Sequence, residues 1–342
     1  MQRILLIGLL TLLGAVSCTN VETTGGRLRI QFETGALQTN AGEPDGVVAD
    51  GGGIAFDEEV PDIVILVAAA NDAIVAKYPG NGTLEGTPAA TQASISFDGL
   101  TAGATYTVYA FANTKGFWTM TSGGDVVSDL TDLTSATQVE ALQFEPTGDD
   151  ELYSDGSLKV KASRLPLSAK GTVTLTGSGN GEISLALLRC VAKVTAVFEN
   201  QYGDGLTLYD FCNKFYHMLP SAGYVVPHES DFPVAWESAG CLDSDMDQLS
   251  IEDDARDSKS WYVFPSIGPY TCDISFYLDA GRTDEHSYTA LPVHDDHARD
   301  ISQLARNQHL TITTRISKGK SVSFNFEVAG WGEPKIEKIE FD

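Results

Sequence analysis

Residues 310–328, LTITTRISKGKSVSFNFEV, decide the fold class of this chain. Apolar side chains alternate with polar ones through residues 310–316 and again through residues 322–328, which is the pattern of strands with one buried face. The segment between them, Ser317-Lys318-Gly319-Lys320, contains the glycine that hairpin connections favour. The stretch therefore predicts a β-hairpin that closes a sheet over an apolar core.

Similar strand patterns occur in the first half of the chain, at residues 28–32, 63–67, 93–97 and 106–112. Turn residues such as Asn81-Gly82 separate them, and short strands at this spacing predict a β-sandwich. Two short helices are expected in the second half, over residues 206–219 and 296–307, because apolar side chains recur there at helical spacing. Neither helix alternates with strands, which disfavours a parallel doubly wound sheet. The fold class is therefore predicted as mostly β, in antiparallel sandwiches with one or two short helices.

The length of 342 residues corresponds to about two domains. A glycine-rich turn at residues 177–181 is a natural junction, because a long alternating strand is predicted to start at Glu182 and to run through Phe198. The predicted organisation is a signal peptide over residues 1–17, an N-terminal β-sandwich domain over residues 18–180 and a C-terminal β-sandwich domain over residues 181–342.

The formal net charge of −25 narrows the choice of partners. Such a surface repels the phosphates of nucleic acids and anionic lipid headgroups, so no nucleic-acid partner is expected. The composition, 42% apolar and 20% charged residues, predicts a chain that folds rather than a disordered one.

Residues 1–18, MQRILLIGLLTLLGAVSC, have the form of an export signal. A positive Arg3 precedes an apolar run that is shorter than the roughly 20 residues of a membrane-spanning helix. The small residues before Cys18 resemble a lipobox, although Ala15 stands where leucine is usual. Cys18 is therefore predicted to be the lipid attachment residue, and its acyl chains, palmitate among them, would anchor the protein firmly. The alternative is an ordinary secretory signal with a nearby cysteine.

The other four cysteines are Cys190, Cys212, Cys241 and Cys272. They form no CxxC pair, which disfavours a zinc knuckle or a thioredoxin-type site, and their three possible disulfide pairings stay open. Cys190 lies within an alternating segment and is expected to be a small buried apolar side chain.

No catalytic signature is present, so no catalytic, cofactor-binding or metal-binding residue is assigned and the protein is not expected to be an enzyme. Two groups of residues are weak metal candidates. Asp243, Asp245, Asp247 and Asp254 imitate the spacing of a calcium loop, but Gln248 stands where that loop needs glycine, which favours a solvated acidic loop. His294 and His297 are a weak candidate for a zinc pair, and a role without metal is favoured for them.

Four features in chain order resemble one family, the Bacteroidales fimbrillins that build type V pili. They are the lipobox at Cys18; residues 96–100, SFDGL, with residues 102–113, AGATYTVYAFAN; residues 165–168, LPLS, followed by residues 188–194, LRCVAKV; and residues 305–312, ARNQHLTI, leading to residues 328–331, VAGW. The resemblance implies two transthyretin-like β-sandwich domains, export as an outer-membrane lipoprotein, a role in cell adhesion, and assembly with other fimbrial subunits by strand exchange. The adhesion target is unknown.

In that family a protease cuts after an arginine and removes the first strand, which opens a groove for a neighbour's strand. The corresponding strand here is residues 27–34, but residues 35–61 contain neither Arg nor Lys. Retention of the strand would suit an anchor or terminating subunit, which is slightly preferred over a stalk or tip subunit. The tail, residues 332–342, is the candidate donor strand, with an ordinary closing edge strand as the alternative.

A different class of function is a surface glycan-binding lipoprotein, whose sugars would stack on exposed aromatic rings. The candidate platform residues for this alternative are Trp236, Trp261, Tyr262, Tyr270 and Tyr288.

Overall fold

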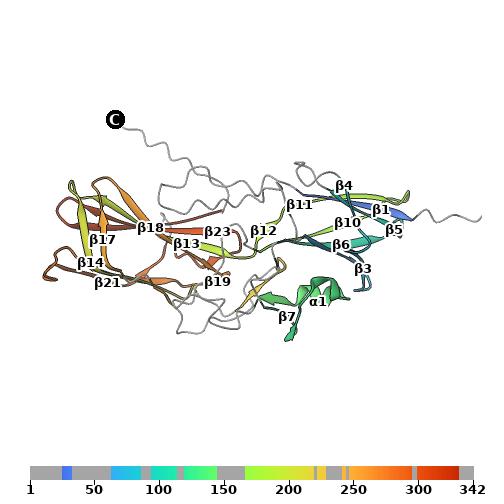
Figure 1. Ribbon diagram of the computed structural model, residues 1–342, viewed down its shortest axis with the longest axis horizontal. Coiled ribbons are helices and arrows are strands. Elements are labelled where there is room, and N and C mark those ends of the chain that lie inside the picture. Colours follow the sequence, from blue (N-terminus) through green and yellow to red (C-terminus); the bar gives the residue numbers. More distant parts are fainter. Residues whose placement is uncertain are drawn as a thin grey trace, which may run out of the picture.

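The computed structural model describes residues 25–32, 63–85, 94–112, 114, 119–144, 166–218, 222–228, 241–243, 246–294 and 299–330. Over these residues the chain is almost entirely β-structure, with one α-helix, α1 (Ala136–Glu140), and one 3₁₀ turn, η2 (Leu130–Asp132). The predicted fold class, a mostly β chain built from antiparallel sandwiches, is confirmed (Figure 1). No helix in this part of the chain has the length and apolar character that crossing a membrane requires.

The N-terminal sandwich consists of two facing sheets (Figure 1). One has the order β11-β1-β5-β4, and the other has the order β12-β10-β6-β2-β3. Their bounds are β1 (Gly26–Phe32), β2 (Val64–Ala69), β3 (Ile74–Tyr78), β4 (Thr83–Glu85), β5 (Ser94–Leu100), β6 (Thr105–Ala112), β10 (Leu167–Thr174), β11 (Asn180–Leu185) and β12 (Leu188–Arg189). The core between the sheets contains Leu28, Ile30, Phe97 and Val108. Within this N-terminal sandwich, all strand pairings are antiparallel except that of β1 with β11.

The C-terminal sandwich has sheets of order β18-β13-β23-β24 and β16-β14-β20-β21, with β17 also pairing with β14. Their bounds are β13 (Ala192–Gln201), β14 (Leu206–Tyr216), β16 (Cys241–Asp243), β17 (Met246–Ile251), β18 (Arg256–Val263), β20 (Thr271–Tyr277), β21 (Glu285–Pro292), β23 (Gln308–Ser317) and β24 (Ser321–Gly330). The predicted hairpin at residues 310–328 is confirmed as β23 and β24, and Gly319 in its turn has a φ of 86°. Leu310, Ile312 and Phe326 lie in the core.

A third apolar core joins the two halves of the chain. In a small sheet of order β15-β9-β7-β8, β9 (Leu142–Phe144) pairs on one side with β7 (Met120–Ser122) and on the other with β15 (Gly223–Tyr224), which comes from the second half of the chain. β8 (Asp125–Val126) forms a hairpin with β7, and a separate short pair joins β19 (Ser266–Ile267) to β22 (Gln303–Leu304). Behind this sheet, Tyr109 and Phe111 of β6 pack with Val225 and Phe264. The two sandwiches therefore share buried side chains.

The predicted helix over residues 206–219 is wrong, because residues 206–216 form strand β14. Its ladder to β20 shifts register after Tyr209, and Asp210 has a φ of 45°. A bulge of this kind inserts one residue and turns the following side chains to the opposite face. The buried side chains of β14 therefore follow the spacing of Leu208, Phe211 and Phe215, which imitates a helix.

The helix predicted over residues 296–307 is also wrong over its described residues. Gln303 and Leu304 form β22, and Asp300 makes an isolated bridge to His294. The continuous strand predicted from Glu182 through Phe198 is divided into β11, β12 and β13. β11 and β12 belong to the N-terminal sheets, so the chain enters the C-terminal sheets with β13, later than the predicted boundary after residue 180.

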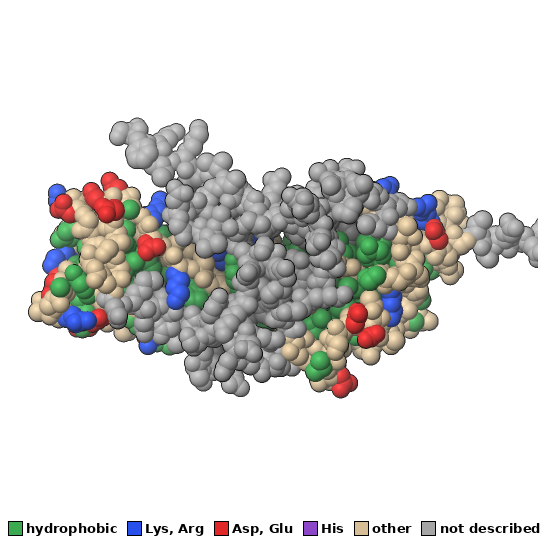
Figure 2. Space-filling view, viewed as in Figure 1, with side chains coloured by type: hydrophobic (Ala, Val, Ile, Leu, Met, Phe, Trp, Pro, Cys, Tyr) green, Lys and Arg blue, Asp and Glu red, His purple; other side chains and the backbone are tan. Residues whose placement is uncertain are grey.

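Figure 2 shows where charged side chains lie on one face of the molecule. Asp and Glu side chains gather at the end of the C-terminal sandwich, with Lys and Arg side chains beside them (Figure 2). The C-terminal sandwich contains two ion pairs between partly exposed side chains: Arg282 bonds to Asp210, and Lys320 bonds to Asp284. Exposed pairs of this kind contribute little to stability.

Candidate functional site

Strand β1 lies between two other strands of its sheet, so its removal would leave two strand edges unpaired. It pairs in parallel with β11 from Arg27 opposite Asn180 to Phe32 opposite Leu185, and antiparallel with β5. The side chains of Leu28 and Ile30 are completely buried in the N-terminal core. A chain that replaced β1 would have to match both neighbours and fill the places of these two side chains.

The opposite face of β1 carries its two arginines, whose side chains are about half exposed: 51% for Arg27 and 46% for Arg29. The Arg29 Nε donates to Ser94 Oγ at 3.1 Å, and Arg27 lies 3.9 Å from Asp98. Both residues lie inside the paired strand. Cleavage after either would cut β1 itself rather than release it whole, and a protease needs an extended unpaired segment. Residues 35–61 lie outside the described part of the chain.

Several predicted site residues also lie outside the described part: the lipid attachment residue Cys18, the tail 332–342, Asp245, His297 and Trp236. The predictions that rest on them stay predictions. Asp243 and Asp247 belong to strands β16 and β17, and His294 packs edge-on against Phe326. Over the described ranges, no three His, Cys, Asp or Glu side chains come close enough to share a metal ion.

Cys190 is fully buried, as predicted, and its Sγ lies 3.6 Å from Ser168 Oγ and 3.4 Å from the carbonyl of Val225. Cys272 is a buried thiol in the C-terminal core, where burial, together with the nearby charge of Asp273, raises its pKa to about 12. Such a thiol stays protonated and unreactive.

The four described aromatic residues proposed for a glycan platform, Trp261, Tyr262, Tyr270 and Tyr288, do not form one. Trp261 and Tyr270 are buried in the C-terminal core, and Tyr270 donates to the backbone oxygen of Ser266 at 2.6 Å. Tyr262 and Tyr288 are half-buried and pack against two different cores. These side chains stabilise the sandwiches instead of facing a ligand.

A polar pocket that the sequence analysis missed lies beside the outer face of β6. Its volume is about 680 Å³. The walls come from β6, from the turn after β2, from α1, from the β7–β8 hairpin, and from β15 and the residues that follow it. The residues used below are Asp72, Tyr109, Gly123, Thr137, Glu140, Tyr224 and His228. The residues come together because the small sheet of order β15-β9-β7-β8 packs over β6.

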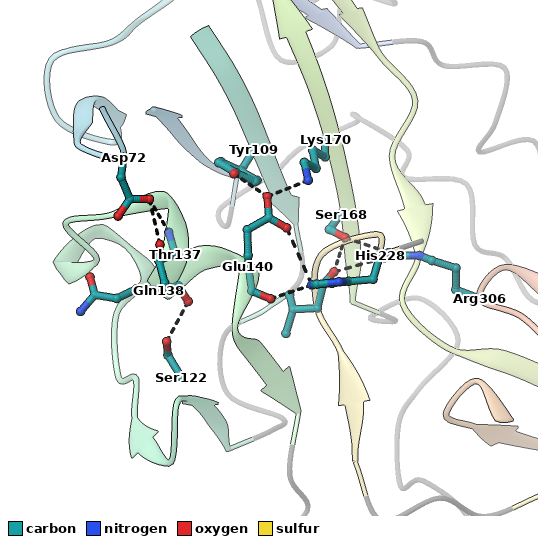
Figure 3. Close-up of polar contacts among 11 residues, drawn as sticks. Asp72, Tyr109, Ser122, Thr137, Gln138, Glu140, Ser168, Lys170, His228 and Arg306 are labelled. Carbon is teal, nitrogen blue, oxygen red and sulfur yellow. Dashed lines mark hydrogen bonds and ion pairs between the residues drawn. The ribbon is translucent and has the colours of Figure 1, made fainter. Parts of the chain in front are cut away.

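Glu140, at the end of α1, is the centre of this pocket (Figure 3). Its Oε1 accepts a hydrogen bond from the Tyr109 hydroxyl at 2.6 Å and lies 2.7 Å from Lys170 Nζ. His228 Nε2 lies 2.8 Å from the Glu140 backbone oxygen and 3.8 Å from Oε2. Burial first, and the bond to Glu140 second, raise the pKa of Tyr109, so its hydroxyl keeps its proton and remains the donor.

The short helix α1 fixes Glu140 in place. Its N-cap Ser135 and Gln138 form a capping box, a pattern that is visible in the sequence as S-x-x-Q and that could have predicted the helix. Asp72 Oδ1 accepts from the Thr137 backbone N–H at 2.8 Å and from the Thr137 hydroxyl at 3.0 Å, and Ser122 donates to the Gln138 carbonyl at 2.7 Å (Figure 3). No local signal in the sequence connects Glu140 with Lys170 or His228.

No family model matches the sequence, and no curated protein matches it either. Among solved structures, a "putative cell adhesion protein" from Bacteroides eggerthii is similar with a TM-score of 0.52 at 14% identity, over 91% of this chain and 98% of that one. A "putative adhesin" from Bacteroides thetaiotaomicron matches with a TM-score of 0.47 at 11% identity, over 90% and 97%. Another from Bacteroides ovatus matches with a TM-score of 0.44 at 10% identity, over 90% and 94%. The first similarity shows a shared fold.

Proposed function

We propose that this protein is a non-enzymatic fimbrial subunit of the type V pilus kind, which acts in cell adhesion and assembles with other subunits by β-strand complementation. The observation that carries the proposal is the central position of β1 between β11 and β5, with Leu28 and Ile30 in the core. Loss of this strand would leave two unpaired strand edges and an apolar slot, which a strand from another subunit can fill. The shared fold with a protein described as a cell adhesion protein supports the same role.

Within that role we favour an anchor or terminating subunit over a stalk or tip subunit. The segment behind β1, residues 35–61, offers no Arg or Lys to a basic-residue protease, and the two arginines of β1 lie within paired strand. A retained β1 keeps the groove closed. The same chain would then remain attached to the outer membrane through acyl chains at Cys18, with its tail, residues 332–342, as the strand offered to a neighbour.

The first experiment is an intact-mass and N-terminal analysis of the protein extracted from its native outer membrane. We expect a chain that begins at an acylated Cys18 and retains β1. A chain that begins within residues 35–61 would show that β1 is removed, and would replace the anchor role by a stalk or tip role. An unmodified chain that begins elsewhere would exclude the lipid anchor.

The second experiment tests strand complementation itself. Gln38→Arg places one arginine in the segment behind β1, and an arginine-specific protease is then added to the purified chain. We expect ladders on gels run without heating, because release of β1 opens the slot to neighbouring subunits. Ser178→Arg is the matched control, since Ser178 lies in the exposed turn between β10 and β11 and a cut there leaves β1 attached. Clean cleavage of the first variant without any polymer would contradict the proposal.

The alternative function, a surface glycan-binding lipoprotein that uses an aromatic platform, is not favoured by the residues first considered for it. Trp261 and Tyr270 are buried, and Tyr262 and Tyr288 pack against the cores.

A further inference from the structure

We propose that the pocket around Glu140 binds a neutral saccharide, which would give this subunit a ligand site of its own, separate from β1 and from strand exchange. The proposal rests on three features of one cavity of about 680 Å³: fixed carboxylate acceptors, a flat aromatic wall and an open rim. A cavity of this size is within the range of small-ligand sites in proteins.

The first feature is a pair of carboxylates that have acceptor capacity left. Glu140 uses Oε1 for Tyr109 and Lys170, and Asp72 uses Oδ1 for both bonds from Thr137. Neither Glu140 Oε2 nor Asp72 Oδ2 accepts a hydrogen bond from any residue of the described chain. A carboxylate oxygen accepts hydrogen bonds only, whereas a sugar hydroxyl can donate one, and charged acceptors form the stronger bonds.

The second feature is a flat apolar wall. The ring of Tyr224 stacks on the imidazole of His228, with centroids 4.2 Å apart and an angle of 21° between the planes. His228 is held in this position by its contact with the Glu140 backbone oxygen. Stacked aromatic rings present apolar faces with polar rims, which suits the C–H face of a sugar whose hydroxyls reach the carboxylates beside it.

The third feature is the rim formed by Gly123 and Gly124 in the turn between β7 and β8. Both have positive φ, 60° and 91°, and a Cβ at either would meet no atom within 4 Å. This turn requires a conformation that favours glycine, and the absence of side chains keeps this edge of the pocket open. A ligand longer than one sugar ring can therefore extend over the turn.

The charge balance selects a neutral ligand. The Glu140 carboxylate is matched by Lys170, so it acts as an oriented acceptor more than as a net charge. The Asp72 carboxylate is exposed and has no basic partner among the described residues, which disfavours anionic sugars. A cation would find only this one uncompensated charge, in a place where water screens it.

The test is ligand-observed NMR on the whole mature chain, with Cys18→Ser to keep it free of lipid. The probes are lactose, maltose, cellobiose and diacetylchitobiose at millimolar concentration, with sialyllactose and lysine methyl ester as anionic and cationic comparisons. We expect saturation transfer to at least one neutral disaccharide. Tyr224→Ala and Glu140→Gln should each weaken its binding about tenfold, the loss of one stacking face or one charge-assisted acceptor.

Matched controls make the same changes outside the pocket: Glu182→Gln on β11 and Tyr277→Ala on β20. Asp72→Asn provides a milder pocket variant if Glu140→Gln fails to fold, because Asn can still accept from Thr137. The proposal is overturned if no neutral probe binds, if only a charged probe binds, or if the pocket variants bind as well as the controls. None of these outcomes bears on strand exchange, which the arginine variant tests separately.

Discussion

At the scale of single residues, the central strand β13 of the C-terminal sandwich buries polar side chains that have partners on neighbouring strands. Thr195 on β13 contacts the Ser260 hydroxyl and His309 Nε2, each at 2.8 Å. Glu199, near the end of the same strand, lies between two arginines. Such groups cost free energy when a partner is removed, because the remaining group stays buried. They therefore make sensitive probes of the fold.

His309 predicts how stability depends on pH. Burial, together with the nearby Lys193 charge, lowers its pKa to about 3, below its ordinary value of 6.5. The unfolded chain therefore takes up a proton on His309 below about pH 6.5, whereas the folded chain does not, and stability falls as pH decreases from there toward about 3.

The measurement is urea unfolding of the wild type and of His309→Gln between pH 7 and pH 4. For each unit by which the pH falls, the free energy of unfolding of the wild type should decrease by about 1 kcal/mol more than that of the variant, which has no imidazole to protonate. Parallel curves for the two proteins would mean that His309 takes up its proton as readily in the folded state.

Glu199 gives a second prediction at this scale. Its Oε2 accepts from Arg315 Nε at 2.7 Å, and its Oε1 lies 3.2 Å from Arg256 Nε. Glu199→Gln removes the charge that both arginines face, and should lower the free energy of unfolding by about 1–3 kcal/mol. Glu252→Gln, at an exposed position, is the control and should change it by less than about 0.5 kcal/mol. Chemical denaturation compares the two; equal stabilities would show that the cluster contributes nothing.

At the scale of elements, β1 and β14 show two ways in which a strand depends on its neighbours. β1 is short but central, and two other strands complete its hydrogen bonds. β14 is long and carries a bulge, after which its buried face changes sides. For β1 this bears on the strand exchange proposed above, which requires that another strand can reproduce the contacts of β1 with β11 and β5.

The variant Ile30→Ala tests how much the buried contacts of β1 contribute to stability. The side chain is fully buried, so its truncation should cost about 2–4 kcal/mol and make β1 easier to displace. Val75→Ala on β3, where the side chain is 43% exposed, should cost less than about 1 kcal/mol. Thermal unfolding gives the stabilities, and hydrogen exchange of β1 amides gives the local opening. Exchange that is unchanged in the first variant would mean that Ile30 does not hold β1 in place.

At the scale of the whole molecule, Arg306 and the third core connect the two sandwiches. Arg306 lies just before β23, yet its guanidinium donates to Ser168 Oγ at 2.8 Å (Figure 3). It also donates to the Leu188 carbonyl at 3.3 Å, and both partners belong to strands of the N-terminal sandwich, β10 and β12. The carbonyl of Val225 lies 3.4 Å from the same group. These contacts, with the shared core behind β6, make the junction part of the packed interior.

Arg306→Met tests this connection. The change keeps the apolar stem and removes the charged donor that Ser168 and the Leu188 carbonyl face in the buried junction. We therefore expect the free energy of unfolding to fall by about 2–4 kcal/mol and unfolding to occur in two steps as the two sandwiches separate. Arg282→Met, at an exposed pair with Asp210, should leave a single transition at nearly the original midpoint. Denaturation followed by both fluorescence and circular dichroism distinguishes unfolding in two steps from unfolding in one step. A single unshifted transition in Arg306→Met would show that Arg306 does not couple the halves.

The sequence by itself determined the parts of this protein that depend on local pattern: the β class, and the hairpin of residues 310–328, whose alternation and glycine turn lie within one short stretch. The tertiary structure decided the rest. The bulge at Asp210 shifted the period of β14 and imitated a helix, and only the packing of β14 between β17 and β20 reveals it. The Glu140 pocket and the Arg306 junction bring together residues that are far apart in the chain. Local periodicity does not predict such contacts, because they depend on how the sheets pack against one another.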